Sequence, residues 1–493
     1  MRFDIILTGA KIADGQGNPL FQADIGVKDE RITAIGNLSH AEADEKIDIT
    51  GLVAAPGFID VHNHAHNEVA GGILVIPKAD NMLRQGVTTI VAGNCGGSPF
   101  PMGEHLDAVE KLPIRQNYAC LVGHGTVRRK VMEGKVNGVP TADELDRIEG
   151  LVSDAMDEGA IGVSAGYFPD SVTTQELIAA AKGAAKKGGV YASHIRSEGE
   201  KLLEAIEEII TVGEKAELPV QISHIKTFGP ANWQKCDDAI RLMEQAHDRG
   251  IRIRADRYPY IASYGGFAGI VPPWARGKKL ESLSGEERKR LCREAELEIS
   301  KIGGADKIII APWETDEEIG GKTLQQLSDE WNLHPGETAA ILAARGRISA
   351  IRFAMCEENL RKFLSHPLVF VASDGHLRKF GDGTSHPRNY GTFPRVLARY
   401  VREQKLLTLE EAVRKMTSMP ATQFNLKDRG VLKVNAIADI VVFDPKTVRD
   451  TATFEQPHAY PEGIKYVLVN GGIAVRDGQT TEGCFGRVIR GMN

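Results

Sequence analysis

The 493-residue sequence lacks the features that mark membrane, secreted and nucleic-acid-binding proteins. No apolar run approaches the roughly 20 residues needed to span a bilayer. The first residues, MRFDIILTGAKIADG, have neither the basic start nor the apolar core of a signal peptide. A net charge of −6 gives no reason to expect nucleic acid or a membrane surface as a partner.

Cysteine is scarce as well, and its spacing gives no sign of a disulfide framework. The six cysteines are scattered along the chain, which favours a reducing cytoplasm. Hydrophobic residues at 42% and charged residues at 26% are typical of a soluble globular protein. The chain is too long for one ordinary domain, but one large barrel with appendages would fit. We therefore expect a cytoplasmic enzyme.

Strand-like patterns occur at both ends of the chain. Residues 1–55 alternate apolar and polar side chains around turn residues at 14–19, and residues 431–493 repeat the pattern at 439–443 and 466–471. Neither fragment has enough strands to close a core alone. We expect the two ends to combine into one small β-sandwich, with two unrelated hairpins as the alternative.

Between these ends, in residues 56–430, apolar strand-like runs alternate with helical patterns such as 174–187 and 201–216. This alternation predicts an α/β fold, a (β/α)8 barrel of the TIM type, with its active site at the C-terminal ends of the strands. Residues 264–347 break the rhythm and predict an insertion after strand 6. The eight expected strands are residues 58–61, 88–91, 118–121, 162–164, 190–193, 220–223, 348–353 and 369–372.

The stretch AAPGFIDVHNHAH, residues 54–66, contains a Pro-Gly turn, a short apolar strand and a His-x-His pair. Residues two apart in an extended chain point the same way, so His62 and His64 aim at one point in space. A histidine-rich loop without a metal is the alternative. The combination looks like the first barrel strand of the metal-dependent amidohydrolase superfamily.

Polar residues also stand at the expected ends of strands 2, 5, 6 and 8, namely Cys95, His194, His224 and Asp374. Any one of them alone also fits a buried histidine, a space-filling cysteine or a helix cap. Their shared position at strand ends favours a zinc site, because imidazole, thiolate and carboxylate are the usual zinc ligands. Zinc lowers the pKa of bound water to about 7, and Asp374 would then move a proton to the leaving nitrogen.

Several motifs, taken in order, resemble the N-acyl-D-amino-acid deacylases (D-aminoacylases) of that superfamily. They are YFPDSVTTQELIAAAKGAAKKGGVYASHIRSEGE, QISHIK, DRYPY, VASDG and HPRNYGTFPRVLARYVRE. The resemblance covers nearly the whole chain. It implies a zinc-dependent enzyme that hydrolyses the amide of an N-acyl-D-amino acid to a carboxylate and a free D-amino acid. The preference for D substrates rests on the resemblance alone.

The resemblance also implies a ligand set. A tightly bound zinc is expected on Cys95, His194 and His224, and a second, weaker position on His62 and His64 with Cys95 shared. Asp374 is the expected general acid and base. In this family the cysteine takes the place of the carboxylated lysine of many relatives. The end of strand 4, at residues 162–164, offers no lysine.

Substrate contacts carry over in the same way. Arg388, in SHPRNYG, corresponds to the carboxylate-binding arginine of the family, and a guanidinium can meet a carboxylate with two parallel hydrogen bonds. Lys226 and Tyr258 look like helpers for the same carboxylate. Met355 looks like part of the side-chain pocket wall, although a core methionine is the alternative.

The sequence departs from the family pattern at three places. His66 adds a third histidine, which we expect to lie beyond the metal, and Tyr264 replaces a small residue. The loop between Asp374 and Arg388 is longer than usual and carries Arg378 and Lys379. These two charges fit either an acidic substrate side chain or the solvated surface, and we expect the surface.

Two rival functions are weighed against this one. A cyclic amidase of the dihydroorotase or hydantoinase type typically has a lysine at the end of strand 4, where this chain has Ser164. A non-catalytic scaffold would usually have lost ligands such as His224 or Asp374, and both are present. The prediction is a zinc-dependent deacylase whose partner is a small-molecule N-acyl-D-amino acid.

Overall fold

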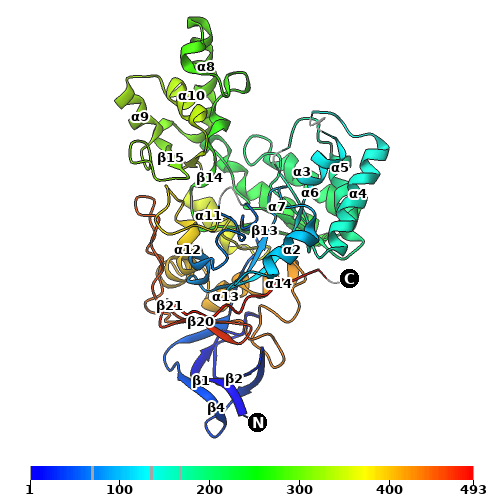
Figure 1. Ribbon diagram of the computed structural model, residues 1–493, viewed down its shortest axis with the longest axis vertical. Coiled ribbons are helices and arrows are strands. Elements are labelled where there is room, and N and C mark those ends of the chain that lie inside the picture. Colours follow the sequence, from blue (N-terminus) through cyan, green and yellow to red (C-terminus); the bar gives the residue numbers. More distant parts are fainter. Residues whose placement is uncertain (1, 68–70, 134–136, 167, 492–493) are drawn as a thin grey trace.

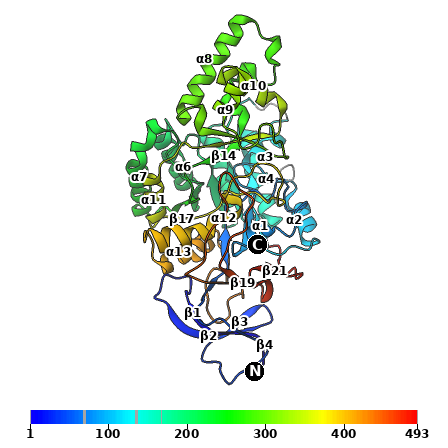
Figure 2. The ribbon, with the colours of Figure 1, turned by 90° about the vertical axis from the view of Figure 1, so that its left-hand side faces the viewer.

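The computed structural model describes residues 2–67, 71–133, 137–166 and 168–491. Tyr167, the first residue of the longest family motif, lies outside these ranges. The molecule is elongated, with a β-sheet at one end, an α/β region in the middle and a helical inserted unit at the other end (Figures 1 and 2). None of the described helices is both long and apolar enough to cross a membrane.

Strands from both ends of the chain share one nine-stranded sheet. β5 joins the two parts, since it pairs in parallel with β1 and antiparallel with β18. Alternate residues of these strands, such as Ile5 and Leu7, are buried together with Ile440 and Leu468. The strands are β1 (Arg2–Ile12), β2 (Phe21–Lys28), β3 (Arg31–Gly36), β4 (Glu42–Asp48), β5 (Val53–Pro56), β18 (Ile440–Phe443), β19 (Ile464–Val469), β20 (Gly472–Arg476) and β21 (Gln479–Thr480).

The middle of the molecule is built on parallel strands that are buried at every position except Arg254 of β13. A three-stranded sheet has the order β6-β7-β8, and a six-stranded sheet has the order β17-β13-β12-β11-β10-β9. Only Leu121 separates β8 from β9, and a bridge from Asn63 to Gly375 connects the chain beyond β6 and β17. The strands are β6 (Phe58–Asp60), β7 (Val87–Ala92), β8 (Asn117–Cys120), β9 (Val122–Gly123), β10 (Gly162–Ala165), β11 (Val190–Ser193), β12 (Val220–Ile222), β13 (Ile253–Arg257) and β17 (Val369–Val371).

Helices between these strands pack an apolar face against the sheets. Leu202, Ile206, Ile209 and Ile210 are buried on one side of α6, at the spacing of an amphipathic helix. The helices of this region are α1 (Asp80–Leu83), α2 (Met102–Glu110), α3 (His124–Val131), α4 (Ala142–Asp157), α5 (Thr174–Ala185), α6 (Leu202–Ala216), α7 (Cys236–Asp248), α11 (Glu357–Ser365), α12 (Arg388–Arg395), the π-helix η7 (Val396–Glu403), α13 (Leu409–Met416) and α14 (Ser418–Gln423).

The expected position of the insertion is wrong. The seventh parallel strand is β13, which pairs with β12 and β17, so the inserted unit follows this strand and not strand 6. Residues 348–353, expected as a barrel strand, form β16 (Ile348–Arg352), which pairs antiparallel with β14 (Ser263–Gly266) and β15 (Ile308–Pro312). The sequence IRADR of β13 carries three charged residues, Arg254, Asp256 and Arg257, so it did not look like a buried strand.

The inserted unit carries its own small core. Its helices α8 (Gly285–Ile302), α9 (Leu324–Trp331) and α10 (Pro335–Arg345) lie at the far end of the molecule from the terminal sheet (Figures 1 and 2). Leu291, Ile310 and Leu327 are among the buried residues of this core, which also includes Tyr258, the residue after the parallel strand β13, and Met355, which follows β16. The unit is therefore anchored on the central region through hydrophobic contacts.

Candidate metal centre

The C-terminal ends of the parallel strands bring distant residues of the chain together. His62 and His64 follow β6, Cys95 follows β7, His194 directly follows β11, and His224 and Asp374 follow β12 and β17. Because these strands run in parallel, their C-terminal ends meet at one edge. Every sequence-predicted ligand lies in this cluster.

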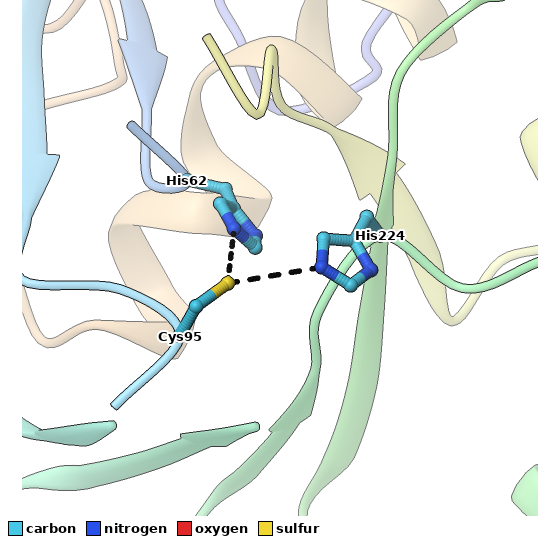
Figure 3. A group of neighbouring side chains, drawn as sticks. All are labelled: His62, Cys95 and His224. Carbon is cyan, nitrogen blue, oxygen red and sulfur yellow. Dashed lines mark hydrogen bonds between the residues drawn. The ribbon is translucent and has the colours of Figure 1, made fainter. Parts of the chain in front are cut away.

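Cys95 lies at the centre of the first group. Its Sγ is 3.5 Å from His62 Nε2, 3.8 Å from His224 Nε2 and 4.0 Å from His194 Nδ1, and Figure 3 shows His62, Cys95 and His224 facing one another. His194 Nδ1 and His224 Nε2 are 2.9 Å apart. A thiolate and imidazole nitrogens that converge at this range are a donor set that suits zinc.

A second group adjoins the first and shares His62 with it. His64 Nε2 lies 3.0 Å, and His62 Nε2 3.5 Å, from Oδ1 of Asp374. The three side chains could also hold a metal ion. The two groups therefore offer adjacent positions, joined through a buried histidine.

Three residues of the cluster have a left-handed backbone. The φ angles are 55° at Cys95, 37° at His224 and 51° at Asp374. Such angles are uncommon outside glycine and are costly unless the surrounding structure holds them. Gly93, at φ 76°, lies so close to Leu121 that a Cβ would meet the carbonyl oxygen of Leu121 at 2.0 Å. The turn after β7 thus needs glycine to bring Cys95 to the strand edge.

The electrostatics of the cluster favour a positive charge. Burial raises the pKa of the Cys95 thiol, but the charge of His62 and hydrogen bonds with His194 and His224 outweigh it and hold the pKa well below its usual value. Burial lowers the pKa of His64, yet hydrogen bonds with Asp374 and Cys95 raise it to about 9. A site that draws protons onto buried imidazoles is one where a divalent cation can take their place.

Two carboxylates that sequence reasoning missed lie behind the histidines. Asp256 Oδ1 is 3.2 Å from His62 Nδ1 and accepts a hydrogen bond from the backbone N–H of His224 at 2.8 Å. Glu198 Oε1 lies 2.7 Å from His224 Nδ1. Such carboxylates orient a histidine and keep its other nitrogen free for a metal. Both residues lie within quoted motifs, Asp256 in DRYPY and Glu198 in HIRSEGE, which was the available signal.

Lys226 is buried beside these groups. It forms an ion pair with Glu198, and its Nζ lies 2.7 Å from His224 Nδ1. Burial raises the pKa of Glu198, but the charges of Lys226 and His224 outweigh it and hold this pKa below its usual value. Lys226 thus lies beside the cluster of predicted ligands, and its partner is the carboxylate of Glu198.

Arg388 and Tyr258 converge on the other side of the cluster. Arg388 Nη1 lies 2.8 Å from Asp374 Oδ2, and Arg388 Cζ lies 4.8 Å from the centre of the Tyr258 ring. Both side chains are almost fully buried. Within the described ranges, Arg388 Nε and the Tyr258 hydroxyl have no hydrogen-bond partner. Unsatisfied buried donors of this kind can receive a carboxylate.

The remaining predicted positions lie around the cluster. His66 Nδ1 accepts a hydrogen bond from the backbone N–H of Gly93 at 3.0 Å. Met355 is buried in the same hydrophobic cluster as Tyr258. Ser164 accepts a hydrogen bond from Gly96 N at 3.0 Å. Arg378 is buried, so the expectation of a solvated charge is wrong for it, while Lys379 is exposed as expected.

These features define a candidate metal centre of a hydrolase type, at the strand ends of an α/β fold. The chain belongs to the amidohydrolase family, whose sequence model matches residues 45–262 and 335–475. The unmatched interval between these ranges falls within the inserted unit.

Several deacylases are similar to this chain over nearly its full length. The chain is 35% identical to a D-aminoacylase of Alcaligenes xylosoxydans xylosoxydans, over 99% of this chain and 97% of the relative. It is 33% identical, with a TM-score of 0.84, to an N-acyl-D-glutamate deacylase of Bordetella bronchiseptica solved with zinc and a phosphonate that mimics the tetrahedral intermediate; the match covers 99% of this chain and all of that one. A D-aminoacylase structure concerned with a binuclear centre, where one metal activates and the second attenuates, is 34% identical with a TM-score of 0.85 over the same shares.

Proposed function

We propose that this protein is a zinc-dependent deacylase that hydrolyses N-acyl-D-amino acids to a carboxylate and a free D-amino acid. The observation that carries the proposal is the group of Cys95, His194 and His224 beside Asp374 and Arg388. This group combines metal donors, a proton carrier and a carboxylate-binding guanidinium. The relatives named above act on substrates of this class.

We assign the tight zinc to Cys95, His194 and His224, and a second, weaker position to His62 and His64 with Cys95 shared. Cys95 Sγ lies 3.5 Å from His62 Nε2 and 3.8 to 4.0 Å from the two histidines of the tight site, which supports a thiolate that serves both positions. When bound, zinc would polarise the acyl carbonyl and lower the pKa of water toward about 7.

Asp374 carries the proton of the reaction. Its carboxylate accepts a proton from the attacking water, whose oxygen forms a bond to the acyl carbon. When the C–N bond breaks, Asp374 returns the proton to the leaving nitrogen. Burial raises the pKa of Asp374, but the charges of Arg388, His62 and His224 outweigh it and hold the pKa well below its usual value, so the carboxylate starts in the basic form.

The α-carboxylate of the substrate binds Arg388, with Tyr258 and Lys226 as further donors. Arg388 and Tyr258 have buried donors to spare, and Lys226 Nζ lies 5.8 Å from the Tyr258 ring centre. Met355 forms part of the side-chain pocket. A substrate held by its carboxylate presents its amide in a fixed orientation, which lowers the entropic part of the barrier.

The architecture is part of the same proposal. We infer that the parallel strands form one (β/α)8 barrel within residues 56–430, with the inserted unit from β14 to β16. The terminal sheet, from 1–55 and 431–493, forms the second domain, a small sandwich. All six cysteines are free, which supports a cytoplasmic location.

The cyclic-amidase alternative is disfavoured at the end of β10. Ser164 stands at that position and is bound to the backbone of the Cys95 loop, so no lysine is available to bridge two metals. Solved hydantoinases are similar to this chain at only 16 to 18% identity, which shows the fold alone.

The test is an assay of N-acetyl-D- and N-acetyl-L-amino acids before and after removal of metal by a chelator. We expect hydrolysis of the D compounds only, loss of activity with chelator, and recovery with zinc. Activity that resists the chelator, or a preference for L compounds, would refute the proposal. Metal analysis of Cys95→Ala tests the site itself, because an unchanged zinc content would exclude Cys95 as a ligand.

A further inference from the structure

Arg378 is a buried arginine on the loop that follows β17. It is 6% exposed, whereas the adjacent Lys379 is exposed. Arg378 Nη2 donates to the backbone carbonyl of Asp382 at 2.8 Å, and Nε has no hydrogen-bond partner among the described residues. No carboxylate in this part of the structure forms an ion pair with it. Burying a charge is costly unless an opposite charge meets it.

An aromatic wall runs along this guanidinium. Arg378 Cζ lies 4.6 Å from the centre of the Trp313 ring, which belongs to the inserted unit. Trp313 in turn contacts His376 and Tyr264, with ring centres 5.3 and 5.9 Å apart. Trp313 and Tyr264 are only half-buried. The wall is thus built by two segments, the loop after β17 and the inserted unit.

The wall connects Arg378 to the candidate metal centre. The His376 ring stacks on His64, with centres 4.8 Å apart and planes 18° apart. At the other side, Tyr264 lies 5.9 Å from Arg388 Cζ. Two guanidiniums therefore flank the Tyr264–Trp313 pair. Arg388 lies beside Asp374, and Arg378 lies at the outer end of the wall.

We propose that Arg378 binds an acidic side chain of the substrate, so that the preferred substrates are N-acyl-D-amino acids with a second carboxylate. This inference rests on the proposed function and specifies its substrate class. Arg388 holds the α-carboxylate, and the side chain extends along Tyr264 and Trp313 to Arg378. A carboxylate there supplies the missing counter-charge, and the rings limit access of water, which strengthens the ion pair.

The experiment compares substrates that have almost the same shape but differ in charge. The zinc-loaded protein is assayed for kcat/KM with N-acetyl-D-glutamate against N-acetyl-D-glutamine, and with N-acetyl-D-aspartate against N-acetyl-D-asparagine. For at least one pair we expect the acid to be preferred by about tenfold or more, since hydrogen bonds to a charged group exceed neutral ones by roughly this amount. Arg378→Gln should bring that ratio to about one, and Arg378→Lys should retain part of it.

Lys379→Gln removes the neighbouring exposed charge and serves as the matched control, with the wild-type ratio expected. If Arg378 only closes its loop through the carbonyl of Asp382, then Arg378→Gln will change the acid and the amide to the same extent, and the inference fails. The inference about Arg378 also fails if the wild type prefers the amides, or prefers substrates with an apolar side chain such as N-acetyl-D-methionine. The proposed function then still stands. If no N-acyl-D-amino acid is hydrolysed, the proposed function itself fails.

Discussion

Arg388 Nη1 lies 2.8 Å from Oδ2 of Asp374, so the proposed substrate anchor also sets the charge of the proposed proton carrier. Replacing Arg388 by Met should lower kcat/KM by about 100-fold, because a charge-assisted contact to the substrate carboxylate is lost. It should also raise the pKa of Asp374, since Arg388 lowers this pKa. The proposed mechanism requires the carboxylate form of Asp374, so the acid limb of the pH profile of kcat/KM should move to higher pH.

Arg388→Lys is the matched control for this prediction. It keeps the positive charge beside Asp374 but loses the two-pronged geometry of the guanidinium. We expect a raised KM with the acid limb nearly in place. An acid limb that does not move in Arg388→Met would show that Arg388 does not control the ionisation of Asp374.

Asp256, on β13, contacts two of the proposed metal ligands, His62 and His224, although neither of them follows that strand. Asp256→Asn keeps one oxygen for the backbone N–H of His224 but places an amide where His62 Nδ1 now meets a carboxylate. Loss of such a carboxylate typically costs 10- to 100-fold in metal affinity. Zinc affinity measured by competition with a chelator should fall by roughly this factor.

Asp238→Asn, on α7, serves as the comparison, because Asp238 is exposed and pairs with Arg241 on the surface. Equal zinc affinity in the two variants would mean that Asp256 does not orient His62.

A buried ion network lies at the start of α3. Glu176 is 0% exposed, lies 2.7 Å from His124 Nε2 and forms an ion pair with Arg128, which is 2% exposed. Glu176→Gln leaves the Arg128 guanidinium without its counter-charge, so the free energy of unfolding should fall by about 3–5 kcal/mol. Urea unfolding followed by circular dichroism measures the change.

Glu149→Gln breaks a surface pair with Lys186, whose side chain is 57% exposed, and should cost about 1 kcal/mol or less. If the two variants lose the same free energy of unfolding, the buried ion pair of Glu176 contributes no more to stability than the surface pair of Glu149, and the prediction is contradicted.

The buried side chain of His105 should lower the free energy of unfolding in acid. Burial lowers the pKa of His105 to about 4, while the unfolded chain titrates near 6.5. Below about pH 6.5 the unfolded state binds a proton at His105 that the native state does not bind. The free energy of unfolding therefore falls as the pH falls toward about 4. Between about pH 7 and about pH 5 this amounts to roughly 2 kcal/mol.

His105→Gln should remove this part of the pH dependence of the unfolding free energy. His40→Gln, at an exposed histidine, should keep the wild-type slope. The prediction is contradicted if His105→Gln and the wild type lose the same stability over this pH range.

Local pattern was enough to place most of the parallel strands. Runs such as Val87–Ala92 and Val190–Ser193 are buried throughout and mostly apolar, because helices or other strands cover both faces. Local pattern missed the strand Ile253–Arg257, because arginines interrupt its apolar run. It also assigned Ile348–Arg352 to the barrel, although this mostly buried strand pairs in the sheet of the inserted unit. The hydrophobic pattern of a segment indicates that a strand is buried, but it does not indicate which strands pair with it.

The same limit applies to the candidate metal centre. The sequence by itself determined which donors stand at strand ends, because parallel strands share one C-terminal edge whatever their neighbours are. Only the tertiary structure decided that Asp256 and Glu198 lie behind the histidines and that Arg378 is buried against Trp313. These contacts join residues far apart in the chain, and their geometry depends on how complete strands and loops pack, which local pattern does not encode.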